Sequence, residues 1–292
     1  MPDETALAVL EEIARATRRR YEVVERFQAG ENQSTYVVRA GAERRVLKLD
    51  PPERLAMHER AARVCGYLAR LGDPVPLTIA AGVAAGRAYT LRTRLPGVQL
   101  SPEDGRHASR LIALVELQAG GAQAAGADVG DWPASVVDTV LHGGAGFCLL
   151  ETMRAHSDET VRLLERLQDL AEASRRSLPD AADILHYDFN PANILVDADT
   201  VSGVVDWEGV RAGDRAFDLA TLLFYAYDAP PARAALWTRL RELRPAPVIA
   251  AYLAHVILRQ VEWSLRLHAP ESGRRYLDRA HRVLSDLHDA GA

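Results

Sequence analysis

The stretch ILHYDFNPANILVD, residues 184–197, holds two of the three asparagines in this 292-residue chain. Short apolar runs on both sides indicate strands that flank a loop. On this loop Asp188 follows His186 by two positions and precedes Asn193 by five. A carboxylate and a carboxamide on one loop, oriented by a histidine, can accept a proton from a hydroxyl and hold a divalent cation through the amide oxygen. The His-x-Asp part alone would also fit a turn, or half of a metal-dependent hydrolase site.

The segment RRVLKLD, residues 44–50, contains Lys48, the only lysine of the chain. Every other basic residue besides histidine is an arginine, so a lysine retained within an apolar alternation suggests a chemical requirement. Glu59 lies eleven residues later and shares a predicted helix face with Leu55 and Ala62. An inward carboxylate needs a cationic partner, and the sequence therefore predicts that Lys48 pairs with Glu59. Taken alone, a lysine and a glutamate at this spacing are more often surface charges.

A third signal lies in VSGVVDWEGVRAGDRAFDLA, where the apolar strand pattern of residues 201–205 ends at Asp206. A carboxylate at the end of a rigid strand is well placed to be a metal ligand. On its own Asp206 could be a turn residue or a helix cap. Its position thirteen residues after Asn193 favours the metal ligand.

The elements expected along the chain change in type near residue 95. Residues 4–19 and about 51–71 predict helices, and period-two alternation predicts strands at 21–27, 34–40, 44–50, 77–81 and 87–95. Later helices are expected at about 102–119, 134–141, 158–177, 214–227, 231–242, 247–268 and 272–289. The sequence therefore predicts an α+β fold: residues 1–95 form a small lobe with an antiparallel sheet and one main helix, and residues 96–292 a larger, mostly helical lobe.

Composition excludes several classes of partner. The net charge is -5 and the pI about 6.0, with both signs interspersed, so no basic footprint for nucleic acid is expected. The two cysteines lack metal-ligand spacing and indicate reduced thiols. The first residues do not resemble a leader, and no apolar run approaches the roughly 18 residues of a membrane span. We expect a cytoplasmic protein with no obligatory protein partner.

The order of these signals resembles the protein-kinase arrangement: a strand lysine, a helix glutamate, Asp-x-x-x-x-Asn and a strand-end aspartate. More closely, the chain resembles the aminoglycoside phosphotransferase and choline kinase family. The resemblance rests on His-x-Asp-x-x-x-x-Asn-Ile-Leu at 186–195, Asp-Trp-Glu at 206–208, and Gly-Asp-x-x-x-Asp-Leu-Ala at 213–220. It implies a protein-kinase-like fold of two lobes. Tyr187 stands where many relatives have glycine, and Arg215 where proline is frequent.

The resemblance also implies the roles of the central residues. Asp188, in the His186 motif, would orient and deprotonate the acceptor hydroxyl, and Asp218 would brace this loop. Asn193 and Asp206 would hold Mg²⁺ between the phosphates of ATP or GTP. Lys48, positioned by Glu59, would bind the α and β phosphates, since phosphoryl transfer depends mostly on positioning and charge neutralisation.

Four further nucleotide contacts follow from the resemblance. Asn32 and Ser34, in the loop 30–34, would donate hydrogen bonds to the nucleotide phosphates together with backbone amides. This loop has a single glycine. The backbone groups of Thr93 and Leu95 would bind adenine, although an ordinary strand end explains that segment nearly as well.

The acceptor is expected to be a small hydroxylated molecule. Only eleven residues separate Asp206 from Asp218, too few for the segment with which protein kinases bind peptides. The last two predicted helices mix acidic and arginine residues, a balance that does not favour a strongly cationic acceptor. Tyr225, Asp228, Glu262 and Trp263 are candidates for lining the acceptor pocket, with helix-core and solvated-face positions as the alternatives.

The sequence therefore predicts an ATP- and Mg²⁺-dependent O-phosphotransferase that acts on a small molecule, first of all an antibiotic. A metabolic kinase for choline, a sugar or homoserine is the nearest alternative. A nucleotide-binding regulatory module without turnover is an alternative of another class. A metal-dependent hydrolase built on His186 and Asp188 is a third, but it would require further ligands and would leave Lys48 unexplained.

Overall fold

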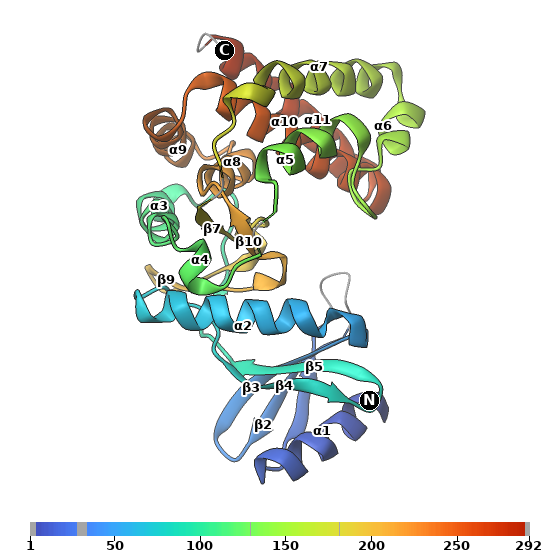
Figure 1. The fold of residues 1–292 in the computed structure, drawn as a ribbon, viewed down its shortest axis with the longest axis vertical. Coiled ribbons are helices and arrows are strands. Elements are labelled where there is room, and N and C mark those ends of the chain that lie inside the picture. Colours follow the sequence, from blue (N-terminus) through green and yellow to red (C-terminus); the bar gives the residue numbers. More distant parts are fainter. Residues whose placement is uncertain (1–3, 28–33, 129, 181, 290–292) are drawn as a thin grey trace. The chain divides into compact units, whose positions relative to one another are not determined.

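The computed structural model describes residues 4–27, 34–128, 130–180 and 182–289, and it divides into two compact units (Figure 1). The first unit comprises Met1–Val98 and Ile194–Val210, and the second comprises Gln99–Asn193 and Arg211–Ala292. This differs from the predicted division at residue 95 because residues 194–210 belong to the first unit. The consequence is that Asp206 lies in the same unit as Lys48.

The first unit is built on a five-stranded antiparallel sheet with the strand order β1-β2-β3-β5-β4. Its strands are β1 (Glu22–Arg26), β2 (Thr35–Ala40), β3 (Glu43–Asp50), β4 (Thr78–Ala84) and β5 (Arg87–Thr93). The central strand β3 pairs with β2 and β5, and its Leu47 and Leu49 are buried. Because side chains alternate along a strand, Lys48 faces away from this pair of leucines.

Two helices pack in the first unit. Helix α1 (Glu4–Thr17) buries Val9 and Ile13 in the same core as Leu47. Helix α2 (Leu55–Arg70) follows the 3-10 turn η1 (Pro52–Arg54), as expected for prolines at a helix start. The buried residues of α2 are His58, Ala61, Val64, Cys65 and Leu68. Their spacing of three and four defines a single inward stripe.

The hairpin of β8 (Ile194–Asp197) and β9 (Thr200–Val204) completes the first unit and leads to the turn η5 (Trp207–Gly209). With β6 (Val98–Gln99) it forms a sheet of order β6-β8-β9. Gly203 packs against Leu95 here, since an added Cβ would lie 2.7 Å from Leu95 Cδ1. Trp207 is fully buried, and its indole N–H donates to the Val204 carbonyl. The turn that carries Asp206 is therefore anchored on both sides.

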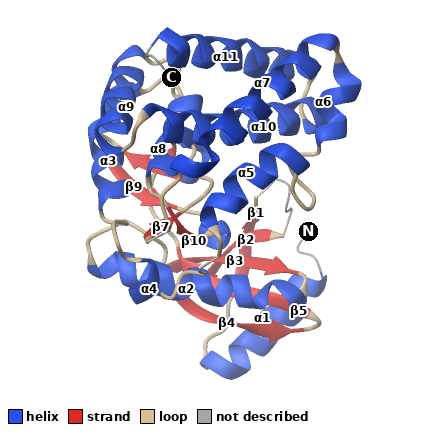
Figure 2. Ribbon diagram, turned by 45° about the horizontal axis from the view of Figure 1, so that its top comes forward, coloured by secondary structure: helices blue, strands red, loops and turns tan. Residues whose placement is uncertain are grey.

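The second unit is mostly helical and is organised around α10 (Figure 2). Helix α10 (Ala246–Leu267) packs against α5, α6, α7, α8 and α11 and is buried along most of its length. The other helices and turns are η2 (Gly105–His107), α3 (Ala108–Glu116), α4 (Ala122–Ala125), α5 (Trp132–His142), α6 (Leu150–His156), α7 (Asp158–Ser174), η3 (Arg175–Ser177), η4 (Pro191–Asn193), α8 (Ala216–Tyr225), α9 (Pro230–Leu243) and α11 (Pro270–Asp289). In the described ranges, no helix has the length and apolar character required to cross a membrane.

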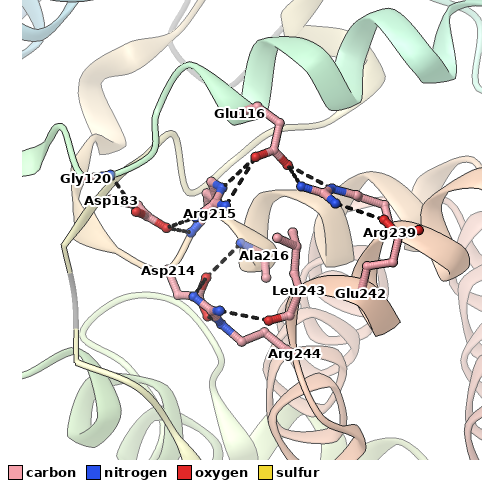
Figure 3. Close-up of polar contacts among 10 residues, drawn as sticks. All are labelled: Glu116, Gly120, Asp183, Asp214, Arg215, Ala216, Arg239, Glu242, Leu243 and Arg244. Carbon is pink, nitrogen blue, oxygen red and sulfur yellow. Dashed lines mark hydrogen bonds and ion pairs between the residues drawn. The ribbon is translucent and has the colours of Figure 1, made fainter.

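Two short strands support the loop of the second unit that carries Asp188. Strand β7 (Asp183–Leu185) ends immediately before it and pairs antiparallel with β10 (Arg211–Gly213). Figure 3 shows the ion pairs around Arg215, which lies two residues after the end of β10. Arg215 lies 2.9 Å from Asp183 and 3.2 Å from Glu116, and Glu116 also binds Arg239. Arg215 thus joins β7 to α3.

Asp214, beside this network, is a buried carboxylate with several donors. The side chain of Arg244 donates to both of its oxygens, at 2.5 and 3.0 Å, and the Tyr252 hydroxyl donates at 2.7 Å. Asp214→Ala would leave these donors without their acceptor, and we expect the free energy of unfolding to fall by about 3–5 kcal/mol. Denaturant unfolding measures this change.

The matched control is Glu242→Ala, since Glu242 is exposed and pairs only at the surface with Arg239. It is expected to change the free energy of unfolding by less than about 0.5 kcal/mol. Equal, small effects of the two substitutions would contradict a structural role for Asp214.

Candidate active site

The loop after β7 is held by a buried carboxylate. The backbone N–H groups of His186 and Tyr187 donate to Asp218 of α8 at 2.8 and 2.9 Å. Asp218 is fully buried, and burial raises the pKa of its carboxyl to about 6. The bracing expected of Asp218 is therefore present.

Tyr187 adopts a left-handed backbone conformation, with φ of 74°. Glycine takes this conformation without steric cost, whereas another residue loses about 1–2 kcal/mol. Contacts of the ring offset this cost. It stacks on Phe217 at 5.4 Å between centroids, and its hydroxyl lies 3.0 Å from His255 Nε2. The guanidinium of Arg211 lies 3.8 Å from the ring centroid.

Asp188 has an oriented but accessible carboxylate, since 46% of its side chain is exposed. Asn193 Nδ2 donates to the carbonyl oxygen of Asp188 at 2.9 Å and to its Oδ2 at 3.0 Å. The side chain of His186 contacts the backbone of the loop, since its Nδ1 accepts a hydrogen bond from the N–H of Asp188 at 3.2 Å. The amide nitrogen of Asn193 is turned toward Asp188, so its Oδ1 is the atom that can serve as a cation ligand.

Arg259 of α10 also contacts this loop, a role that was not predicted from the sequence. Its side chain donates to the Tyr187 carbonyl at 2.7 Å and lies 3.5 Å from Asp188 Oδ1. Its guanidinium packs 4.7 Å from the centroid of the Tyr187 ring. An arginine in the middle of a predicted apolar helix could have indicated this role, because a buried charge requires partners.

In the first unit, Lys48 is clamped between two carboxylates. Its Nζ lies 2.8 Å from Asp206 Oδ1 and 3.1 Å from Glu208 Oε1, and 16% of its side chain is exposed. Burial lowers the pKa of Lys48, but the two carboxylates outweigh it and hold the pKa above its usual value. The ammonium is therefore charged. Asp206, with φ of 66°, also lies in the left-handed region, and its side chain is half exposed.

The predicted pairing of Lys48 with Glu59 was wrong. Glu59 is exposed on α2, and the inward position is occupied by His58. The carboxylate that α2 was expected to supply comes instead from Glu208 of η5, a residue of the Asp-Trp-Glu motif to which the sequence analysis assigned no individual role. Burial raises the pKa of Glu208, yet Arg92, His58 and Lys48 together hold it well below its usual range.

The structure describes three of the four other residues that were predicted to contact the nucleotide. Asn32 and most of the loop 30–34 lie outside the described residues, while Ser34 is half-buried and its carbonyl accepts the Leu49 N–H. The Thr93 N–H donates to the Leu77 carbonyl at 2.9 Å, and the adenine contact of the Thr93 backbone stays a prediction. Leu95 packs its side chain on Gly203, and its adenine contact stays a prediction.

Two of the four candidate acceptor residues are neutralised by arginines. Glu262 is fully buried, accepts from Arg266 at 2.6 Å and contacts Thr152, so its position is structural. Asp228 is exposed but pairs with Arg279 at 2.6 Å and Arg282 at 2.7 Å. Its carboxylate is therefore already bound by two cations.

The two aromatic candidates are both half-buried. The hydroxyl of Tyr225 donates to Gln260 at 2.5 Å, and Trp263 is half-buried with Arg266 against its ring. Both stay predictions as acceptor contacts.

In the described part of the chain, no three or more His, Cys, Asp or Glu side chains are grouped as metal ligands, which the hydrolase alternative required.

Asp218 gives the site a testable pH dependence. Its pKa is raised from 3.8 to about 6, so between these values the unfolded chain releases a proton that the folded chain retains. The free energy of unfolding of the wild type should therefore fall relative to that of Asp218→Asn as the pH rises from about 4 to about 6. The expected change is a few kcal/mol, since one pKa unit is about 1.4 kcal/mol. Denaturant unfolding of both proteins across this range measures it; a constant difference would contradict the raised pKa.

Comparisons with known proteins agree with this geometry. A model of the phosphotransferase enzyme family matches residues 23–252. A homoserine kinase of Methylorubrum populi is 30% identical over 260 residues, which cover 77% of this chain and 78% of that protein. The crystal structure of a thermostable mutant of aminoglycoside phosphotransferase APH(4)-Ia, in ternary complex with ADP and hygromycin B, matches with a TM-score of 0.72 and 17% identity, covering 98% of this chain and 99% of that one.

Macrolide 2'-phosphotransferase MphH from Brachybacterium faecium matches with a TM-score of 0.62 and 20% identity, over 94% of this chain and 97% of that one. At such identities these two structures show the fold alone, a kinase-like α+β fold as predicted. The family match covers most of the chain and includes Lys48, Asp188, Asn193 and Asp206. The resemblance drawn from the sequence is thus confirmed: the chain belongs to the phosphotransferase enzyme family and is a phosphotransferase with an alcohol group as acceptor.

Proposed function

We propose that the protein transfers the γ-phosphoryl group of ATP, with Mg²⁺, to a hydroxyl of a small molecule. The observation that carries the proposal is the accessible carboxylate of Asp188, fixed by Asn193 on a braced loop. Lys48, charged and held between Asp206 and Glu208, supplies the cation that a nucleotide phosphate requires. The complex of APH(4)-Ia with ADP, on the same fold, supports nucleotide use.

Each residue has a distinct proposed role. Asp188 accepts a hydrogen bond from the acceptor hydroxyl and takes its proton as the oxygen becomes the nucleophile. Asn193 Oδ1 and the half-exposed Asp206 carboxylate are hard oxygen ligands of the kind that Mg²⁺ prefers. Lys48 binds phosphate oxygens. When bound, Mg²⁺ would neutralise phosphate charge during transfer.

Arg259 fits this scheme as the residue that fixes the Asp188 loop from α10. Its contact with the Tyr187 carbonyl restrains the backbone next to Asp188, and its guanidinium lies 3.5 Å from Asp188 Oδ1. Both contacts limit the positions that the Asp188 carboxylate can take.

The proposed acceptor is a hydroxylated antibiotic of low positive charge. A polycationic acceptor would require free carboxylates, and Asp228 and Glu262 are both paired with arginines. The macrolide phosphotransferase with the same fold is named for an acceptor outside the aminoglycoside class. A second candidate is homoserine or a related hydroxy amino acid, which the 30% identical homoserine kinase favours.

The test is release of ADP from Mg-ATP by purified protein against a panel of acceptors. The panel contains macrolide, nucleoside, peptide and aminoglycoside antibiotics, homoserine, choline and sugars, and Asp188→Asn is assayed alongside. Acceptor-dependent release that Asp188→Asn abolishes would support the proposal and identify the acceptor class. Nucleotide binding without turnover on any acceptor would favour the regulatory module. Replacing ATP by GTP in the same assay determines the nucleotide preference.

A further inference from the structure

A protein-kinase-like site is expected to orient its phosphate-binding lysine through a carboxylate on the following helix. In this chain α2 places His58 on its buried face and exposes Glu59. The lysine is nevertheless paired, because Glu208 Oε1 lies 3.1 Å from Lys48 Nζ. The carboxylate that pairs with Lys48 therefore lies on the turn η5 and not on the helix, and a histidine occupies the inward position on the helix.

Glu208 is itself held by cationic and polar side chains from three elements. Arg92 of β5 lies 3.0 Å from Glu208 Oε1, and His58 Nδ1 lies 3.6 Å from the same oxygen. His58 Nε2 is 3.0 Å from Asp50 Oδ2 at the end of β3. All of these side chains are buried or nearly so, and all belong to the first unit. Such a network has few alternative arrangements, because each buried charge depends on its neighbours.

We propose that Glu208 positions Lys48 for nucleotide binding. We also propose that His58 of α2 acts indirectly, by holding Glu208 in place. The inference rests on the proposed function, since it assigns Lys48 to the nucleotide phosphates. Asp206 is the proposed Mg²⁺ ligand, so Glu208 is the carboxylate that remains dedicated to Lys48. Neither Glu208 nor His58 touches the reacting atoms in this scheme; both are positioning residues.

A double-mutant cycle on nucleotide affinity tests whether Glu208 acts through Lys48. The probe is Mg-AMP-PNP, which requires no acceptor, and calorimetry measures its Kd for the wild type, Lys48→Ala, Glu208→Gln and the double variant. Lys48→Ala is expected to weaken binding about 10–100-fold. Glu208→Gln should weaken it on the order of tenfold, and the double variant should be no weaker than Lys48→Ala alone. Glu208→Asp, which keeps the charge, should recover part of the loss.

His58→Gln is a second variant in case Glu208→Gln does not fold, which thermal unfolding would reveal. It should weaken binding in the wild-type background and have no effect in the Lys48→Ala background. Glu53→Gln, an exposed carboxylate of η1, is the control and should bind as the wild type does. Additive losses in both cycles would overturn the inference, as would a loss for Glu59→Gln equal to that for Lys48→Ala. Absence of binding by the wild type would instead overturn the proposed function itself.

Discussion

Asp188→Asn is expected to lower kcat about 10²–10⁴-fold while leaving the fold intact, because an amide cannot accept the proton of the acceptor hydroxyl. The substituted side chain keeps an oxygen that can accept from Asn193 Nδ2, so the loop should retain its geometry. The KM for ATP should change little, since Asp188 is assigned to the acceptor. Steady-state kinetics with the acceptor identified by the panel measures both quantities.

Asp197→Asn is the matched control, as Asp197 is an exposed carboxylate at the end of β8. It should keep wild-type kcat and KM. Retention of kcat by Asp188→Asn, with normal activity in the control, would exclude Asp188 as the base and would redirect the search to other groups near the acceptor.

Lys48→Arg should lose most activity although it preserves the positive charge. Lys48 Nζ fits between carboxylate oxygens at 2.8 and 3.1 Å in a largely buried position. A guanidinium is planar and longer than an ammonium, so it cannot occupy this position without displacing Asp206 or Glu208. We expect kcat/KM for ATP to fall about 10²–10³-fold, the range found when one preorganised donor to a transition-state charge is removed.

The control is the reverse exchange, Arg44→Lys, on the same strand. Arg44 is exposed, and its replacement by lysine should leave kcat/KM unchanged. Full activity of Lys48→Arg would show that the site requires only a charge, and the single lysine of the chain would then lack a chemical explanation.

The sequence predicted the elements well where pattern and termination signals agreed. The strands β2, β3 and β5 begin and end within two residues of the expected bounds, and α10 and α11 within two residues as well. Clear alternation and flanking proline or glycine are local features that a sequence displays directly. The short helices α4 and α6 were not predicted, because a helix of one or two turns has too little periodicity to be recognised.

The errors at the candidate site have two physical origins. Adjacent residues on a helix point about 100° apart, so the choice between His58 and Glu59 depended on the phase of α2. A buried histidine and an exposed glutamate both interrupt an apolar stripe, and periodicity could not distinguish them. The roles of Glu208 and Arg259 depend on contacts with distant segments, which spacing along the chain does not encode.

The path of the chain between the two units has a consequence for synthesis. The chain leaves the first unit after residue 98, returns to it for residues 194–210 and then leaves again. During translation, the first 98 residues emerge without the hairpin and turn that contribute Trp207 and Glu208 to their core. The first unit can therefore be completed only after residue 210 has left the ribosome, when the loop carrying Asp188 has already emerged. Neither unit corresponds to a contiguous fragment, and a single proteolytic cut or truncation cannot release either one whole.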